Sequence, residues 1–590
     1  MKKFMTGNEA VAQGAYEAGI SYASAYPGTP STEILENIAL FKDDIISEWA
    51  PNEKVALETA IGASIAGARS LCAMKMVGVN VAADPLFTYA YMGVNGALVL
   101  ISADDPGMAS SQNEQDNRNY AKFAKVAMLE PSDSQECKDM IKSAVEISEK
   151  YDTTVLFRMT QRVCHSKGLV ELGEKRETPI KDYIKDNTKF DAMPVYSKAL
   201  RYKLEDRLKK LEEFSNETDL NFIEWNDSKI GIVTSGVSYQ YAKEVFGDNA
   251  SYLKLGFTHP LPMKKIKDFS SKVDTLYVIE ELEPYIEEQL KVNGINCIGK
   301  EKIPNIGELN TDIVAKNLLG IEKKLIETVE EKVVRRPPTL CAGCPHRGFF
   351  YELGKFKNVM VAGDIGCYGL GGSEPLKAKD TCICMGGSAG TAHGAQRVFD
   401  KFDREKRTVA TMGDSTFFHT GINGLIGTLY NGGKVVTCIL DNRTTGMTGH
   451  QENPGTGFTL QGEVSEDINI ETVVRALGCK NIRTINPHNL EEVRETLKWA
   501  LSLDEPSVII TRYPCALKRY SDADKKEFST LKDKYFVNQD LCIGCKICIK
   551  TGCPAIRFSN VEKKSSIMES QCVGCSVCSQ VCPKVAILRK

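Results

Sequence analysis

Two runs of cysteines near the carboxyl end constrain this chain more than any other feature of its sequence. The first run holds Cys542, Cys545, Cys548 and Cys553, and the second holds Cys572, Cys575, Cys578 and Cys582. Each run is closed by Cys-Pro, and the second has the CxxCxxCxxxCP spacing of two-cluster iron–sulfur domains. Zinc ribbons and disulfide frameworks are alternatives, but the repeated run favours two clusters that carry electrons.

The two-cluster pattern also predicts how the thiolates are shared. Three cysteines of one run take their fourth ligand from the other run. One [4Fe–4S] cluster is therefore expected on Cys542, Cys545, Cys548 and Cys582, and the other on Cys572, Cys575, Cys578 and Cys553.

Length and composition exclude several classes of protein. With 590 residues, 42% of them hydrophobic, the chain is expected to form three or four globular domains. A net charge of -3 with scattered lysines and arginines argues against a nucleic-acid partner. No stretch approaches the ~18 apolar residues of a membrane helix, and no signal peptide is recognised, so a cytoplasmic protein is expected. Twenty cysteines in that compartment indicate metal sites and suggest an anaerobic lifestyle.

Alternating apolar strands and helices predict an α/β fold with several domains. Arg335, Arg336, Pro337 and Pro338 mark one domain boundary, because prolines end a helix. The expected divisions are an α/β domain at 1–170, a connecting segment at 171–225, a smaller α/β domain at 226–335, a third α/β domain at 336–520 and a cluster domain at 530–590.

The third domain contains a predicted βαβ unit. Residues 407–412 and 435–440 are expected to be strands, with a turn at Gly413, Asp414 and Ser415 and a helix whose apolar face is Ile422, Leu425, Ile426 and Leu429. Asp414 and Asn442 then lie beyond the carboxyl ends of two parallel strands, where open α/β sheets bind ligands. Their oxygens suit Mg²⁺ with phosphate groups, which the glycines allow to approach.

The spacing between Gly413-Asp414-Ser415 and Asp441-Asn442 resembles the thiamine diphosphate motif. This resemblance implies that Asp414, Asn442 and the main-chain oxygen of Thr444 hold Mg²⁺. The segment with Gly386 and Gly387 resembles the loop that approaches thiamine diphosphate in such enzymes. The alternative for the Gly-Asp-Ser segment alone is an ordinary turn at the end of a strand.

Four more cysteines in the same domain resemble the ligands of the cluster nearest the thiamine in 2-oxoacid:ferredoxin oxidoreductases. They are Cys341, Cys344, Cys367 and Cys515. The resemblance implies a third cluster, although Pro345 and His346 stand where relatives have glycine. Buried structural thiols are the alternative, and Cys382 and Cys384 are rival ligands.

The amino-terminal domain carries two further resemblances to this family. The turn Tyr26-Pro-Gly-Thr-Pro-Ser-Thr32 resembles its YPxTPS segment, in which the residue at the position of Thr29 faces the substrate carbonyl. Glu53, at the start of a predicted helix, matches the catalytic glutamate that hydrogen-bonds the aminopyrimidine ring. Glu58 is the second choice, and a solvated helix-start acid is the alternative.

The domain order resembles that of the large alpha subunits of indolepyruvate:ferredoxin oxidoreductases. It runs from a pyrimidine-binding domain through a transketolase-C-like domain and a diphosphate-binding domain to a two-cluster ferredoxin domain. The resemblance implies oxidative decarboxylation of aryl 2-oxoacids, with coenzyme A as acyl acceptor and external ferredoxin as electron acceptor. It also implies a smaller beta subunit as partner, in a heterodimer or a dimer of heterodimers.

Other activities stay open from the sequence. Ala103, Asp104 and Asp105 stand where pyruvate enzymes have an arginine, which weakens the pyruvate reading. A 2-oxoglutarate or branched-chain enzyme, a non-redox thiamine decarboxylase and a pure electron-transfer subunit remain alternatives.

Overall fold

The computed structural model describes every residue except 227–228, 323–336, 403, 530 and 532. The chain divides into two units, Met1–Thr328 and Val329–Lys590, each built around its own sheets. The domain boundary predicted at residues 335–336 lies outside the described residues.

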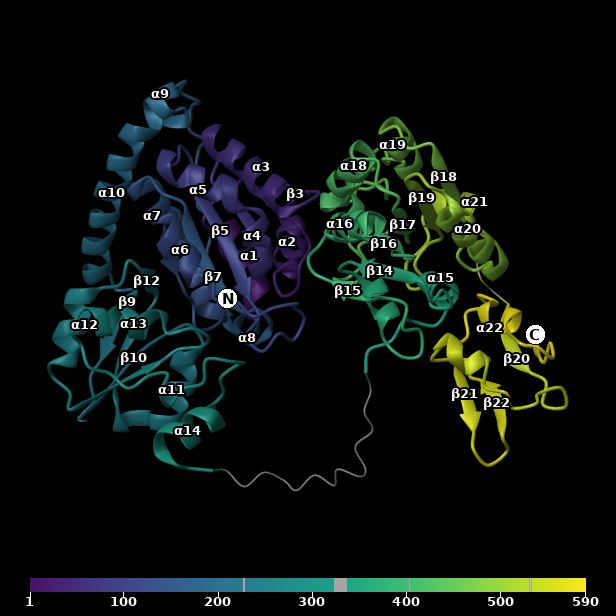
Figure 1. Ribbon diagram of the computed structural model, residues 1–590. Coiled ribbons are helices and arrows are strands. Elements are labelled where there is room, and N and C mark those ends of the chain that lie inside the picture. The colour runs from purple at the N-terminus through teal and green to yellow at the C-terminus, as the bar shows by residue number, and fades with distance from the viewer. Residues whose placement is uncertain (227–228, 323–336, 403, 530, 532) are drawn as a thin grey trace. The chain divides into compact units, whose positions relative to one another are not determined.

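A seven-stranded sheet forms the centre of the first unit (Figure 1). Its order is β12-β6-β7-β5-β4-β2-β3, and β12 is antiparallel to its neighbour while the other strands are parallel. The bounds are β2 (Tyr22–Ala25), β3 (Ile46–Trp49), β4 (Ser70–Lys75), β5 (Leu98–Asp104), β6 (Ala127–Leu129), β7 (Val155–Thr160) and β12 (Phe257–His259). Every residue of β5 is buried, as expected for a parallel strand covered on both faces.

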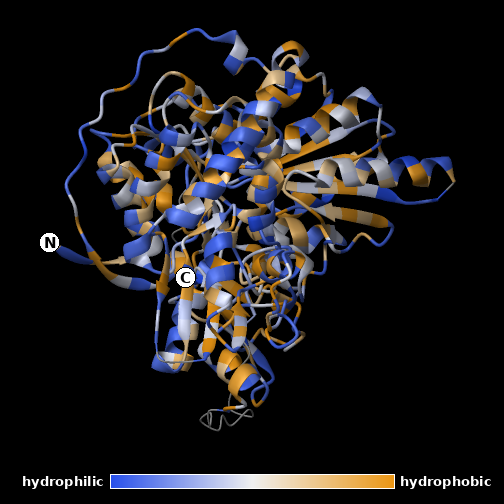
Figure 2. Cartoon of the chain, turned by 90° about the vertical axis from the view of Figure 1, so that its left-hand side faces the viewer, coloured by the Kyte–Doolittle hydropathy of each residue, from blue (hydrophilic) through white to orange (hydrophobic). Residues whose placement is uncertain are grey.

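Helices complete this layer. On one face, α3 (Glu53–Ile65) and α5 (Ala83–Met92) contribute to a core that includes Leu98 and Leu156. Elsewhere α1 (Gly7–Glu17) packs against α7 (Ser134–Tyr151). Figure 2 shows the resulting pattern, with hydrophobic colour concentrated on strands and hydrophilic stripes along helices.

A smaller four-stranded sheet follows in the same unit, with the order β13-β10-β11-β9. It consists of β9 (Asn221–Glu224), β10 (Ile230–Ser235), β11 (Ser251–Leu255) and β13 (Thr275–Ile279). Val233 and Leu253 join the hydrophobic core of the first sheet, so the two sheets of this unit share one core. The segment expected only to connect them contains a helix, α10 (Pro194–Glu217).

A buried histidine at the end of β12 makes the first unit sensitive to acid. Nδ1 of His259 lies 2.8 Å from the main-chain oxygen of Val126, and burial lowers the pKa of His259 to about 4. Because the unfolded chain titrates near 6.5, it binds more protons than the folded chain between pH 6.5 and 4. The stability from this neutral histidine is present above pH 6.5 and is lost as pH falls towards 4.

We therefore expect His259→Asn to flatten the acid limb of the thermal stability profile. Between pH 6.5 and 4, the free energy of unfolding of the wild-type chain should fall by up to ~1.4 kcal/mol per pH unit more than that of the variant. Melting temperatures at pH 4.5, 5.5, 6.5 and 7.5 measure the difference. Parallel profiles for the two proteins would contradict this assignment.

The second unit contains a six-stranded parallel sheet with the order β15-β14-β16-β17-β19-β18. Its strands are β14 (Val359–Gly363), β15 (Thr381–Cys382), β16 (Arg407–Gly413), β17 (Val436–Asp441), β18 (Asn481–Ile485) and β19 (Ser507–Arg512). Separate cores cover its faces, one containing Phe349 of α15 (His346–Leu353) and Leu497 of α20 (Leu490–Ser502). The other contains Ala389 of α16 (Ser388–Lys401) and Leu425 of α18 (Ile422–Tyr430). This is a doubly wound arrangement.

Two details differ from the predicted βαβ unit. The segment after β16 enters a helix at once, α17 (Asp414–Thr416), and reaches α18 through a π-helical turn at Phe417–Gly421. The turn predicted at Asp414 is therefore the start of a helix, and such π turns occur often at functional sites. Ile426, assigned to the apolar face, is 46% exposed, whereas Leu425 is buried.

The carboxyl-terminal part has two small antiparallel sheets, shown in yellow in Figure 1. They pair β20 (Tyr535–Val537) with β23 (Ile587–Arg589) and β21 (Ile556–Ser559) with β22 (Lys564–Ile567). Hydrogen bonds join this part to the larger sheet domain of its unit. Nη1 of Arg347 donates to the main-chain oxygen of Thr551 at 2.8 Å, and the Gln580 amide donates to that of His488 at 2.7 Å.

Candidate functional site

Three oxygen atoms converge at the carboxyl ends of β16 and β17. The side-chain oxygen of Asn442 lies 3.0 Å from Oδ1 of Asp414 and 2.9 Å from the main-chain oxygen of Thr444. The other carboxylate oxygen of Asp414, Oδ2, accepts hydrogen bonds at 3.1 Å from the Thr444 N–H and from the Asn453 amide. These bonds fix the carboxylate so that Oδ1 faces the other two oxygens.

The Asn442 amide has two possible orientations at this place. In the orientation that the structure has, its oxygen faces the two other oxygens, an arrangement that suits a cation, and turning the amide over would replace both contacts by hydrogen bonds from its nitrogen. Neighbouring ligands of an octahedral Mg²⁺ are about 2.8–3.0 Å apart, given Mg–O distances of about 2.0–2.1 Å. The two distances from the Asn442 oxygen have that spacing, and carboxylate, amide and carbonyl oxygens are the types of atom that bind Mg²⁺.

Electrostatics favour a cation at the same place. Burial, together with the nearby carboxylate of Asp441, raises the pKa of Asp414 to about 7. Burial likewise raises the pKa of Asp441, against the opposing effect of Arg512 and Arg443. A divalent cation would reverse this effect at Asp414 and hold the carboxylate ionised.

A glycine loop is held by an aspartate at the carboxyl end of β14, the strand next to β16, and sequence reasoning gave this aspartate no role. Asp364, which follows β14, accepts hydrogen bonds from the N–H groups of Gly386 at 2.8 Å and Ser388 at 3.0 Å. Gly386 has a φ of +80°, and a Cβ there would lie 1.9 Å from Oγ1 of Thr420. Only glycine fits this position, and the two hydrogen bonds to Asp364 hold the loop backbone in this conformation.

The structure brings Cys341, Cys344, Cys367 and Cys515 into electrostatic reach of one another. Burial raises the pKa of Cys344 to about 12, and the neighbouring thiols of Cys515 and Cys367 add to the shift. Burial raises that of Cys367 to about 11, with contributions from Cys515 and Cys341. The rivals Cys382 and Cys384 are exposed and lie near Asp364 instead.

This cysteine quartet adjoins both the oxygen site and the cluster domain. The Cys515 N–H donates to the main-chain oxygen of Asn442 at 2.9 Å. On the other side, a Cβ on Gly343 would lie 2.0 Å from Cγ2 of Val573, so the Cys341–Cys344 turn presses against the turn that carries Cys572 and Cys575. Buried Arg347 spans the same junction, donating to the main-chain oxygens of Cys341 and Thr551.

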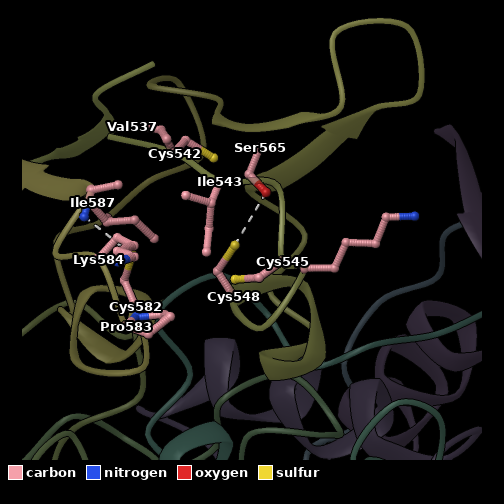
Figure 3. Close-up of a pocket in the computed structure, with 12 residues that line it drawn as sticks. Val537, Cys542, Ile543, Cys545, Cys548, Ser565, Cys582, Pro583, Lys584 and Ile587 are labelled. Atoms are coloured by element: carbon pink, nitrogen blue, oxygen red, sulfur yellow. Dashed lines mark hydrogen bonds between the residues drawn. The ribbon is translucent and has the colours of Figure 1, made fainter. Parts of the chain in front are cut away.

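In the cluster domain, a pocket is lined by Cys542, Cys545, Cys548 and Cys582 (Figure 3). The first three come from one run and the fourth from the other, which is the grouping that the sequence predicts. Sγ of Cys548 bonds to the Ser565 hydroxyl at 3.3 Å, and Sγ of Cys582 accepts from the Ala586 N–H at 3.2 Å. Hydrogen bonds to ligand sulfurs tune the potential of a cluster.

The second run forms a similar group. Burial raises the pKa of Cys575 to about 11, and Cys553 and Cys572 act on it in the same direction. Burial also raises the pKa of Cys578, with added effects from Cys575, Cys553 and Cys572. Cys553 thus belongs with the cysteines of the other run.

No group of three or more His, Cys, Asp or Glu side chains in the described part of the chain is arranged around a single metal ion. Cluster ligands each bind a different iron, so their sulfurs stand further apart than the ligands of one ion.

In the first unit, Thr29 and Glu53 lie beyond the carboxyl ends of β2 and β3, two neighbouring strands of the seven-stranded sheet. Glu53 begins α3 and is 6% exposed, and a Cβ on Gly78 would come within 2.8 Å of its Oε1. Glu58 is exposed and pairs with Lys54. Thr29 lies in the turn after β2, partly exposed, and its main-chain oxygen accepts from the Ser110 hydroxyl at 3.5 Å.

Comparisons with known proteins cover all of these parts. Three family models match, described as "Pyruvate flavodoxin/ferredoxin oxidoreductase, thiamine diP-bdg" at residues 13–204, "Thiamine pyrophosphate enzyme, C-terminal TPP binding domain" at 364–511 and "4Fe-4S dicluster domain" at 534–583. The indolepyruvate oxidoreductase subunit IorA of Pyrococcus horikoshii is 42% identical over 99% of this chain and 96% of its own length. This chain belongs to the IorA family.

Other IorA proteins agree with this assignment. That of Pyrococcus abyssi is 42% identical over 98% of this chain and 95% of its own length. That of Archaeoglobus fulgidus is 40% identical over 94% of this chain and 93% of its own length.

A solved 2-oxoglutarate:ferredoxin oxidoreductase from Magnetococcus marinus has a TM-score of 0.46 at 17% identity, covering 54% of this chain and 65% of its own.

Membership in the IorA family confirms the predicted fold class and family resemblance. The chain is an iron–sulfur oxidoreductase with two thiamine diphosphate-binding domains and a carboxyl-terminal [4Fe–4S] dicluster domain. None of the helices that the structure describes has the length and apolar composition needed to cross a membrane.

Proposed function

We propose that this chain is the catalytic subunit for ferredoxin-dependent oxidative decarboxylation of aryl 2-oxoacids such as indolepyruvate. Coenzyme A accepts the acyl group, and the products are arylacetyl-CoA, CO₂ and reduced ferredoxin. Similarity to IorA proteins along nearly the whole chain is the observation that carries the proposal. A smaller beta subunit and an external ferredoxin are the expected protein partners.

The proposed metal ligands are Asp414, Asn442 and the main-chain oxygen of Thr444, which hold Mg²⁺ on the diphosphate of thiamine. Gly413, Ser415, Gly386 and Gly387 form the surrounding surface. When bound, thiamine diphosphate supplies the nucleophilic carbon for cleavage beside the 2-oxo group, and the clusters accept electrons singly. The protein's part is to hold the phosphate end through the metal and to keep the glycine loop in one conformation.

Three clusters are proposed along the electron path. The quartet that includes Cys515 lies next to the oxygen site through the Cys515–Asn442 hydrogen bond. It adjoins the cluster domain through the Gly343–Val573 contact. This sequence of neighbours supports electron transfer from the thiamine site to the cluster with Cys553, Cys572, Cys575 and Cys578, and then to the cluster with Cys542, Cys545, Cys548 and Cys582.

Glu53 is proposed as the carboxylate that hydrogen-bonds the aminopyrimidine ring. Its burial at the start of α3 supports this role, whereas the Glu58 side chain is exposed and forms an ion pair with Lys54. Thr29, at the same edge of the sheet, is proposed to face the substrate carbonyl.

We expect Glu53→Gln to keep thiamine diphosphate and iron but to slow turnover by about a hundredfold or more, the scale of losing a positioned proton-transfer partner. Stopped-flow reduction of ferredoxin under anaerobic conditions measures the rate. Glu58→Gln is the matched control and should turn over normally. Normal turnover in Glu53→Gln together with slow turnover in Glu58→Gln would assign the role to Glu58 instead.

The function itself is tested by an anaerobic assay of the chain with its small subunit. Indolepyruvate, phenylpyruvate, pyruvate and 2-oxoglutarate are offered in turn, with coenzyme A and ferredoxin. We expect coenzyme A-dependent ferredoxin reduction with the two aryl substrates. Preference for pyruvate or 2-oxoglutarate would reject the aryl substrate, and aldehyde formed without any electron acceptor would reject the redox reaction.

A further inference from the structure

Among the described residues, the carboxyl end of β5 and the two residues that close it carry no cation for a substrate carboxylate. A 2-oxoacid carries a negative charge next to the carbonyl that reacts, and a site for it needs a positive partner. Asp104 ends β5 and Asp105 follows it, at the position where the resemblance to pyruvate enzymes implies an arginine. Neither aspartate can take that role.

Both aspartates have structural partners instead. Asp104 pairs with Nε of Arg158 at 2.9 Å, deep in the unit. Asp105 accepts hydrogen bonds from the N–H groups of Ala109 and Ser110 and from the Ser111 hydroxyl at 2.6 Å. Asp105 therefore fixes the loop 106–111 above the sheet edge.

Lys75 lies at this edge, on the strand next to β5. It ends β4, which runs between β2 and β5, and it pairs in register with Ala103. Because all three strands are parallel, their carboxyl ends deliver the turn with Thr29, Lys75 and Asp105 to the same side of the sheet. This is the side on which open α/β sheets bind ligands.

The aliphatic stem of Lys75 packs directly on that turn. A Cβ on Gly28 would lie 3.1 Å from Cγ and 3.2 Å from Cδ of Lys75. Three residues further on, Gly78 contacts the Glu53 side chain. Lys75 thus lies against the turn that carries Thr29, and Glu53 is close enough to act on its charge.

The ammonium group of Lys75 has unused hydrogen-bonding capacity. Nζ donates to the main-chain oxygen of Ser110 at 3.1 Å, and no carboxylate among the described residues lies within 4.0 Å of it. An ammonium group has three donors, so two remain for a ligand. Burial lowers the pKa of Lys75, against the opposing effect of Asp105 and Glu53, so an anion at this place would restore the charged form.

We propose that Lys75 binds the carboxylate of the 2-oxoacid substrate and takes the place of the arginine of pyruvate enzymes. The proposal rests on the function proposed above. The contact exists in the ground state and is lost when the carboxylate departs as CO₂, so it contributes to substrate binding more than to the rate of the chemical step.

The test uses the whole enzyme with its small subunit and phenylpyruvate as substrate. We expect Lys75→Met to raise KM about ten- to hundredfold, the scale of a lost charge-assisted hydrogen bond, with kcat changed by a few fold at most. Lys75→Arg should recover most of the loss. Lys229→Met, at a side chain that is 85% exposed, is the control and should match wild type.

Inhibitors separate carboxylate recognition from a structural role. Wild type should bind 3-phenylpropionate at least about tenfold more tightly than the neutral 3-phenylpropanamide, and Lys75→Met should lose this preference while keeping thiamine diphosphate and iron. An unchanged preference in Lys75→Met overturns the proposal. If wild type oxidises no 2-oxoacid, the proposed function fails first, whereas an active wild type with an unaffected Lys75→Met rejects only the role of Lys75.

Discussion

Replacing Asp414 by alanine should abolish activity by removing thiamine diphosphate from a folded protein. In the proposed site the carboxylate is one of three Mg²⁺ ligands, 3.0 Å from the Asn442 oxygen, and the metal would link the protein to the diphosphate. We expect the affinity for the cofactor to fall by more than about a hundredfold. Losing a residue that only hydrogen-bonds a metal ligand already lowers metal affinity by about 10- to 100-fold, and Asp414 is proposed as a ligand itself. Thiamine content after gel filtration and calorimetric titration in the presence of Mg²⁺ measure the loss.

The fold should survive this change because Asp414 costs free energy when no cation is present. Its pKa of about 7 in the folded chain lies above the usual value, so its ionised form is disfavoured by folding. Iron content and melting temperature should therefore match those of wild type without Mg²⁺. Asp504→Ala, at a side chain that is 82% exposed, should leave cofactor binding unchanged.

A second pair of variants tests the orientation of the Asn442 amide. If its oxygen faces the metal, Asn442→Asp should retain Mg²⁺-dependent thiamine binding, and Asn442→Leu should lose it. Without Mg²⁺, Asn442→Asp should be destabilised, because two carboxylates would then face each other about 3 Å apart. Thiamine bound at wild-type stoichiometry in Asp414→Ala would show that the site lies elsewhere.

Local sequence signals located two neighbouring strands, β16 and β17, of the six-stranded sheet in the second unit. Buried parallel strands are continuous apolar runs, and residues 435–440 lie within one residue of β17 at either end. The proposed oxygen ligands could be named from the sequence because motif residues follow such strands directly. The start of α17 was predicted as a turn, because a helix that begins on a Gly-Asp-Ser segment has no apolar periodicity of its own.

The helix α10 shows why other parts could not be predicted. Its buried stripe contains Leu200, Leu204 and Leu211, but the position between them is Arg207. That arginine is buried because Nη1 donates to the main-chain oxygen of Ala90 at 2.8 Å. A charged residue in the stripe hides the periodicity, and its partner is over a hundred positions away in the chain.

Asp364 and Lys75 escaped sequence reasoning for a related reason. Neither belongs to a recognised spacing of ligands, and each gains its significance from neighbouring strands. Asp364 is important because two loop N–H groups point at it, and Lys75 because β2 and β5 place Gly28 and Asp105 beside it. Such residues can be identified only after the register of the sheet is known.

The third cluster should appear as a loss of about four irons in single cysteine variants of the whole chain. After anaerobic reconstitution, wild type should contain about twelve irons, and Cys344→Ser or Cys515→Ser about eight. Ferredoxin reduction should fall below detection in both variants, while thiamine diphosphate stays bound. The physical reason is the position of this quartet, which contacts Asn442 through Cys515 and the cluster domain through Gly343.

Cys384→Ser is the control for this experiment, because Cys384 is the rival ligand and lies exposed beside Asp364 rather than in the quartet. It should keep about twelve irons and normal electron transfer. Iron lost from Cys384→Ser but not from Cys515→Ser would move the cluster to the other pair of cysteines. About eight irons in wild type would rule out the third cluster. Electrons would then have to pass from the thiamine site to the carboxyl-terminal domain without a cluster between them.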